Sequence, residues 1–198
     1  MAAIACVSAP HVGRGDKQHR SARPVWPHNQ AQDFFAEIAD GGIDLFPAAR
    51  VWIQKDEYDY YTSDAWQSPR THGGIDVDDV LELVKRNTQG KVSFVHGDDD
   101  TSLSGITFGV GGKHTWASQF VAVQGREHMV VLASDNMYLY ENLDTHKAIA
   151  QTLDAASNLR TQDRMRSIVS EARFLVPGHD PGVFTRFPRV SDRIVRIE

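Results

Sequence analysis

The sequence predicts an α/β protein built from packed layers of strands and helices. Short runs rich in apolar and β-branched residues, typical of strands, occupy 91–95, 106–110, 119–124 and 129–134. Segments with an apolar stripe of helical period lie on either side of them. Strands interleaved with helices favour a layered α/β architecture over an all-helical or all-strand one.

The first 32 residues differ from the rest of the chain. Four basic residues stand against one acid, and no apolar period of 2 or 3.6 runs through them. Three prolines break any amphipathic presequence helix. We therefore expect an irregular N-terminal segment over 1–40 and a domain over 41–198.

The elements before the strand region follow in order. A short helix over 33–39 and a glycine turn precede a strand at 49–54 and a helix at 55–61. Asp76 is the expected N-cap of a second helix. Its predicted buried stripe is Val80, Leu81, Leu83 and Val84.

Helical periodicity returns after the strands. It predicts a long helix over 154–171, followed by a short strand at 174–176. A brief helix through Phe184 and a last strand at 193–197 complete the expected elements.

Composition limits the class of protein. The formal net charge of −5 argues against a broad nucleic-acid-binding surface. The single cysteine, Cys6, excludes an intrachain disulfide. No apolar run reaches the roughly 20 residues that span a bilayer. We expect a cytoplasmic protein with neither nucleic-acid nor membrane partners.

Three potential metal ligands each follow a predicted strand. They are His114 after a glycine pair, Asp135 after an apolar run, and His179 in Pro-Gly-His-Asp. Two imidazoles and a carboxylate suit Zn²⁺, and the same set suits Fe(II). The alternative interpretation is that both histidines are ordinary loop residues and Asp135 caps a turn.

Three stretches carry a resemblance to a known family. They are Gly-Gly-Ile-Asp-Leu-Phe-Pro at 41–47, Ala-Ser-Asp-Asn at 133–136 and Val-Pro-Gly-His-Asp-Pro at 176–181. From Gly41 onward the chain resembles hydrolases of the metallo-β-lactamase superfamily, in the N-acyl homoserine lactonase-like, quorum-quenching group. The resemblance implies an αββα sandwich, incomplete here on its N-terminal side.

The resemblance also implies roles for individual residues. His114 would bind one zinc, Asp135 would bridge two zincs, and His179 would bind the second. Tyr138, three residues after the bridging aspartate, would assist the lactone carbonyl, so that Asp135 and Tyr138 form the implied catalytic pair. The implied reaction is attack by a metal-bound hydroxide on a lactone or ester.

The chain departs from the family at the first metal motif. The family places H-x-H-x-D-H before the glycine pair, where 34–39 reads Phe-Phe-Ala-Glu-Ile-Ala. With those four ligands absent, at most one ion is expected from the remaining three. The candidate replacements are His28, Asp33, Glu37 and Asp40.

Other features have competing interpretations. The acidic-aromatic run 57–61 would line a substrate entrance or pack tyrosines on the sheet. Trp116 would wall an acyl pocket or belong to the core. The acidic run 98–100 lacks the ligand spacing of a calcium loop and is expected to be a solvated turn. Ser134 has no nucleophile-elbow context.

Two functions follow from these observations. The first is a zinc hydrolase acting on a small lactone or ester, with impaired activity in this chain. The second is a non-catalytic or binding protein that keeps the fold without a dinuclear metal site. Uncovered sheet edges would favour low solubility or a homodimer.

Overall fold

The computed structural model describes residues 50–68, 75–191 and 194–197. The predictions for the N-terminal segment 1–40, for the helix at 33–39 and for the stretch 41–47 lie outside these described residues. So do the four candidate replacement ligands.

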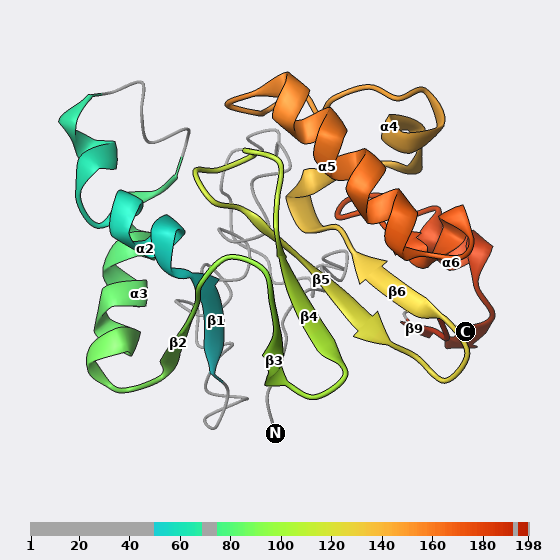
Figure 1. Cartoon of the computed structure of the whole chain (residues 1–198), viewed down its shortest axis with the longest axis horizontal. Coiled ribbons are helices and arrows are strands. Elements are labelled where there is room, and N and C mark those ends of the chain that lie inside the picture. Colours follow the sequence, from blue (N-terminus) through green and yellow to red (C-terminus); the bar gives the residue numbers. More distant parts are fainter. Residues whose placement is uncertain (1–49, 69–74, 192–193, 198) are drawn as a thin grey trace, which may run out of the picture.

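A five-stranded sheet forms the centre of the described structure (Figure 1). Its order is β3 (Asp99–Leu103), β4 (Ile106–Val110), β5 (Gln119–Gln124), β6 (Met129–Leu132) and β7 (Leu175–Val176). Neighbours from β3 to β6 are antiparallel, and β7 runs parallel to β6. As a result β4, β6 and β7 point the same way, and their carboxyl ends share one edge of the sheet.

Helix α5 (Ala155–Ile168) covers one face of this sheet (Figure 1). The Asp154 side chain caps it by accepting a hydrogen bond from the Ser157 N–H at 3.0 Å. Met165 on α5 is fully buried in a core with Phe120, Val131 and Phe174. This helix supplies the crossover that a parallel β6–β7 pair requires.

A smaller unit forms the second pair of layers. Strand β1 (Val51–Gln54) pairs in parallel with β2 (Val92–Val95), and α2 (Lys55–Tyr61) and α3 (Val77–Thr88) connect them. Leu83 of α3 packs on Val92 of the two-stranded sheet.

The two sheets meet through an apolar core. Val95 of β2 packs with Phe108 and Val121 of the large sheet, and Trp52 stacks on Phe108 with ring centroids 5.6 Å apart. The layers therefore run helix, sheet, sheet, helix, as the αββα prediction requires. The second sheet has two strands among the described residues.

Short elements complete the described chain. Among these are the 3-10 helices Asp64–Gln67, Ser134–Asn136 and Ala172–Phe174. The others are α4 (Tyr140–Asp144), α6 (Val183–Arg186), β8 (Arg189–Ser191) and β9 (Ile194–Val195).

Several element predictions were wrong in detail. The acidic run 98–100 was expected to be a solvated turn, but its last two residues belong to β3, because Asp99 pairs with Phe108 of β4. Leu81, predicted in the buried stripe, is 60% exposed, whereas Val80 and Leu83 of the same stripe are buried as predicted.

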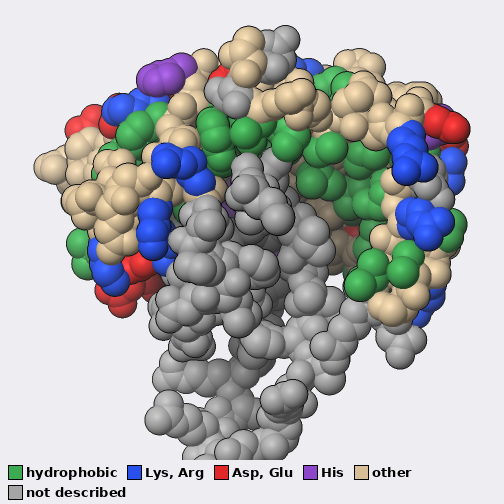
Figure 2. All heavy atoms as spheres, turned by 90° about the horizontal axis from the view of Figure 1, so that it is seen from below, with side chains coloured by type: hydrophobic (Ala, Val, Ile, Leu, Met, Phe, Trp, Pro, Cys, Tyr) green, Lys and Arg blue, Asp and Glu red, His purple; other side chains and the backbone are tan. Residues whose placement is uncertain are grey.

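The described surface carries apolar side chains on the face seen from below in Figure 2. The exposed large hydrophobic residues include Val190 and Ile194, each 56% exposed, on the β8–β9 hairpin. Within the described ranges, no helix has the length and apolar character needed to cross a membrane.

Candidate functional site

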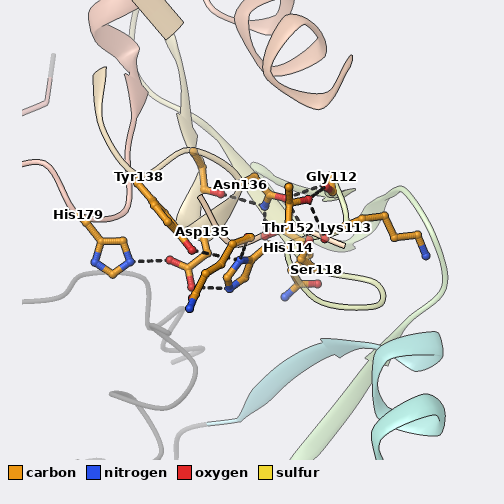
Figure 3. Close-up of polar contacts among 12 residues, drawn as sticks. Gly112, Lys113, His114, Ser118, Asp135, Asn136, Tyr138, Thr152 and His179 are labelled. Atoms are coloured by element: carbon orange, nitrogen blue, oxygen red, sulfur yellow. Dashed lines mark hydrogen bonds and ion pairs between the residues drawn. The ribbon is translucent and has the colours of Figure 1, made fainter. Parts of the chain in front are cut away.

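The three predicted ligands lie together at the shared carboxyl edge of β4, β6 and β7. His114 follows β4, Asp135 follows β6, and His179 follows β7. His114 Nε2 lies 3.2 Å from Asp135 Oδ2, and His179 Nε2 lies 2.7 Å from Asp135 Oδ1 (Figure 3). The two histidines thus contact opposite oxygens of one carboxylate.

This cluster is buried and polar. The side chains of His114 and Asp135 are 5% and 7% exposed, and that of His179 is 19% exposed. Burial alone would raise the pKa of Asp135, but hydrogen bonds from the two histidines and their charges hold it well below its ordinary range. The site therefore favours an ionised carboxylate.

The pKa of His114 is shifted upward. Burial alone would lower the pKa of His114, but its hydrogen bond to Asp135 and the negative charge there raise it above the ordinary value. The Gln151 carbonyl adds to this shift. Without a metal, the structure therefore favours a protonated His114 beside an ionised Asp135.

Gln151 also fixes the proton on one side of the His114 ring. Its carbonyl oxygen lies 2.8 Å from Nδ1 and can only accept, so Nδ1 carries hydrogen. Nε2 is then the atom presented to Asp135, and it becomes the ligating nitrogen once it loses its proton. A carbonyl behind the ring is typical of metal-binding histidines.

Tyr138 lies between the two imidazoles. Its ring is edge-on to His114 at 5.8 Å and to His179 at 5.1 Å between centroids (Figure 3). Its Oη lies 3.3 Å from the protonated Nδ1 of His114 and therefore accepts there, leaving the hydroxyl proton to donate elsewhere. Burial raises the pKa of Tyr138, which keeps the phenol protonated.

The backbone is left-handed directly before two of the site residues. Lys113 has φ 59° and Ser134 has φ 50°. Non-glycine residues rarely adopt this region, and such strain persists where surrounding contacts enforce it. Both turns aim the next side chain, His114 or Asp135, into the cluster.

Helix α2 holds the loop that carries His114. The Glu57 carboxylate accepts hydrogen bonds from the Ala117 N–H and from the Thr115 side chain. Tyr60 stacks on Trp116 with centroids 4.1 Å apart and planes 10° apart. The interpretation that the run 57–61 packs tyrosines on the sheet holds for Tyr58, whose ring lies 4.9 Å from that of Phe94 in β2, whereas Tyr60 packs on the loop.

Trp116 lies two residues after His114 and is 40% exposed. Besides the stacked Tyr60, it has Lys113 Nζ over its ring at 4.1 Å from the centroid. Its ring is thus engaged by its own chain, and a substrate-binding role remains a proposal.

Other histidines lie apart from this cluster. His146 pairs with Asp163 at the surface at 3.1 Å, and His128 stacks on Phe174. Among the residues that the structure describes, no group of three or more His, Cys, Asp or Glu side chains is arranged to hold one metal ion. The nitrogen and oxygen donors of His114, Asp135 and His179 suit a metal. Each histidine, however, pairs separately with Asp135, and the three do not surround one point.

The sequence did not identify Gln151 or Asn136 as contributors to the site. Gln151 acts through a backbone carbonyl, which any residue carries, so no sequence signal marks it. Asn136 does carry one signal, since it lies inside the quoted Ala-Ser-Asp-Asn stretch.

The order of layers is that of the metallo-β-lactamase fold, and comparison with solved structures supports this fold. No family model matches the sequence, and no curated protein matches it. A structure of an AiiA variant from B. thuringiensis, with N-decanoyl-L-homoserine at its active site, matches with a TM-score of 0.55 and 17% identity. The match covers 78% of this chain and 56% of that one.

A second solved structure gives the same result. AidC, described as a dizinc quorum-quenching lactonase in complex with a product, matches with a TM-score of 0.52 and 17% identity over 69% of this chain and 49% of its own. The chain thus spans about half the length of the structures it resembles. At this identity the likeness establishes the fold alone.

Proposed function

We propose that the chain is a metal-dependent hydrolase that opens a lactone or related ester, with reduced activity in this chain. One observation carries the proposal: two histidines on separate strand ends contact opposite oxygens of one buried aspartate. A buried carboxylate that two imidazoles contact brings together the nitrogen and oxygen donors that suit a divalent metal ion.

The chain's own residues would act as follows. His114 and His179 would each present Nε2, and Asp135 would present one oxygen to each side. Zn²⁺ is the proposed ion, and when bound it would acidify a water molecule and polarise a carbonyl. The described residues supply two protein ligands on each side of Asp135, fewer than the three of a typical catalytic zinc site, so we expect at most one ion to be held.

Tyr138 would provide the hydrogen bond to the substrate. Its proton is not used by His114, and its raised pKa keeps that proton in place. A donor aimed at a developing oxyanion stabilises the transition state. We assign Tyr138 to the carbonyl or leaving oxygen, and Trp116 to the margin of the substrate site.

A second function is favoured by a different observation. The lack of a three-ligand group within the described ranges is what a fold without its chemistry would show. In that case the chain binds small molecules or another protein, and the His114–Asp135–His179 cluster is a buried structural network.

Hydrolysis of N-acyl homoserine lactones and a simple aryl ester, by chain prepared with added zinc, tests the proposal. Tyr138→Phe removes only the hydroxyl, and loss of one such donor lowers kcat about 100- to 1,000-fold. Arg160→Lys, at an exposed position of α5, serves as a control with expected wild-type activity. Hydrolysis absent from the wild type supports the second function, and hydrolysis unchanged in Tyr138→Phe overturns the role given to Tyr138.

A further inference from the structure

Asn136 follows Asp135 directly and is fully buried. It takes no part in the proposed chemistry, yet it is an amide placed where an apolar residue would ordinarily fill the core. A buried amide persists only where its hydrogen-bonding groups are satisfied. Its partners therefore show what it does.

All four partners of the Asn136 side chain lie in the two segments that carry the site. Oδ1 accepts from the Gly112 N–H at 2.7 Å and from Ser118 Oγ at 3.0 Å. Nδ2 donates to the carbonyls of Gln119 and Ala133, each at 3.0 Å. One side chain thus ties both ends of the His114 loop to the turn that carries Asp135.

The packing around this amide leaves the loop little freedom. A Cβ atom at Gly111 would lie 2.1 Å from Asn136 Oδ1, and one at Gly112 would lie 2.6 Å from the Asn158 Cα. Asn158 also donates to the Asn136 carbonyl at 3.0 Å, which anchors the turn to α5. The glycine pair is therefore required for close approach of the loop to this network.

We infer that Asn136 is a positioning residue, which sets the separation of His114 from Asp135 by holding their two loops together. The inference rests on the proposed function for its chemical consequence, though not for the geometry itself. Groups on two independent loops lose alignment when their supporting contacts are removed, and shifts near 1 Å are enough to disable a site.

The experiment compares Asn136→Ala with Gln162→Leu in the metal-free chain. Gln162 is equally buried and donates to Lys147 and Asn158, so among the printed contacts it reaches the Asn136 turn only through a second side chain. The measurement is the pair of His114 ring nitrogens in long-range ¹H–¹⁵N spectra, which report the hydrogen bonds to Gln151 and Asp135. We expect both nitrogen signals to move in Asn136→Ala and to stay in place in Gln162→Leu.

The His114 spectrum of the variants decides whether Asn136 positions the His114 loop. Asn136→Ala that is destabilised but retains the wild-type His114 spectrum overturns the inference and makes Asn136 an ordinary core amide. If Asn136→Ala does not fold, Ser118→Ala, which removes one of the four contacts, replaces it. A smaller displacement of the same signals then supports the inference, and an unchanged spectrum overturns it.

A zinc titration separates this inference from the proposed function. If the wild type binds zinc, the dissociation constant should rise about 10- to 100-fold in Asn136→Ala, the range found for residues that orient metal ligands. An unchanged constant would overturn the inference. If the wild type binds no zinc, the proposed function fails, and the spectra of the metal-free chain still decide the role of Asn136.

Discussion

His179 Nε2 lies 2.7 Å from Oδ1 of Asp135, whereas the second carboxylate oxygen faces the other histidine of the site. The contact joins two loops separated by more than forty residues of sequence, and the parallel pairing of β6 with β7 places them side by side. Asp135 is therefore the centre of the candidate site.

Replacing Asp135 by Asn should destabilise the metal-free chain. The change keeps the shape but removes the charge that both imidazoles face in a buried setting, and losing charged hydrogen bonds of this kind costs about 1.5–3 kcal/mol. Urea unfolding gives the free energy. Asp163→Asn is the matched control, because Asp163 pairs with His146 on the surface, where the cost should be about 0–1 kcal/mol. Equal losses in the two variants would contradict the account.

The contribution of the His114–Asp135 pair to the free energy of unfolding should depend on pH. A raised pKa in His114 gives stability that is complete below its ordinary value and is lost as pH rises through the raised one. A lowered pKa in Asp135 gives stability that is complete above its ordinary value and is lost on acidification through the lowered one. The stability contributions of both residues are complete between about pH 4 and 6.5.

The check is the difference in unfolding free energy between wild type and Asp135→Asn, measured at pH 5.5 and pH 9. The difference should be larger at the lower pH, where His114 is charged. A difference that does not change between the two would show that the pair is not ionised as described.

Glu57→Gln should stabilise the chain at alkaline pH. Burial raises the pKa of Glu57 despite opposing hydrogen bonds from Thr115 and Ala117. The cost of ionising it therefore appears as pH rises above the ordinary value and is complete above the raised one. Gln keeps an oxygen acceptor for the Ala117 N–H and carries no charge. In thermal melts, the Tm of Glu57→Gln should exceed that of the wild type by more at pH 8 than at pH 4. An equal difference in Tm at the two pH values would be inconsistent with a buried charge.

Self-association is expected of the chain expressed alone. Val190 and Ile194 are both more than half exposed on the β8–β9 hairpin, and apolar groups of this kind favour contact between copies. Light scattering coupled to size exclusion should show a dimer or larger species, which Val190→Lys would reduce. A wild-type monomer over a wide concentration range would rule this out.

Much of the fold could be predicted from local pattern. The apolar runs of β4, β5 and β6 and the Asp76 cap are confirmed, because period and cap chemistry act within a few residues. Strand β3 was missed because Asp99 opposes strand formation locally, and only pairing with β4 overrides it.

The candidate site was predictable in its residues and not in its arrangement. His114, Asp135 and His179 each follow a strand in the sequence, but their convergence depends on strands β4, β6 and β7 sharing a direction, which no local pattern encodes. The roles of Glu57 and Asn136 depend on contacts across 60 and 24 residues of sequence. Such contacts leave no periodic signal.

The zinc content of the purified chain, after expression with added zinc, tests the central claim most directly. Plasma mass spectrometry should find about one zinc ion per chain, held by the site's imidazoles and carboxylate, and Asp135→Ala should abolish it. Zinc absent from the wild type, or retained in Asp135→Ala, would contradict the assignment of this cluster as a metal site.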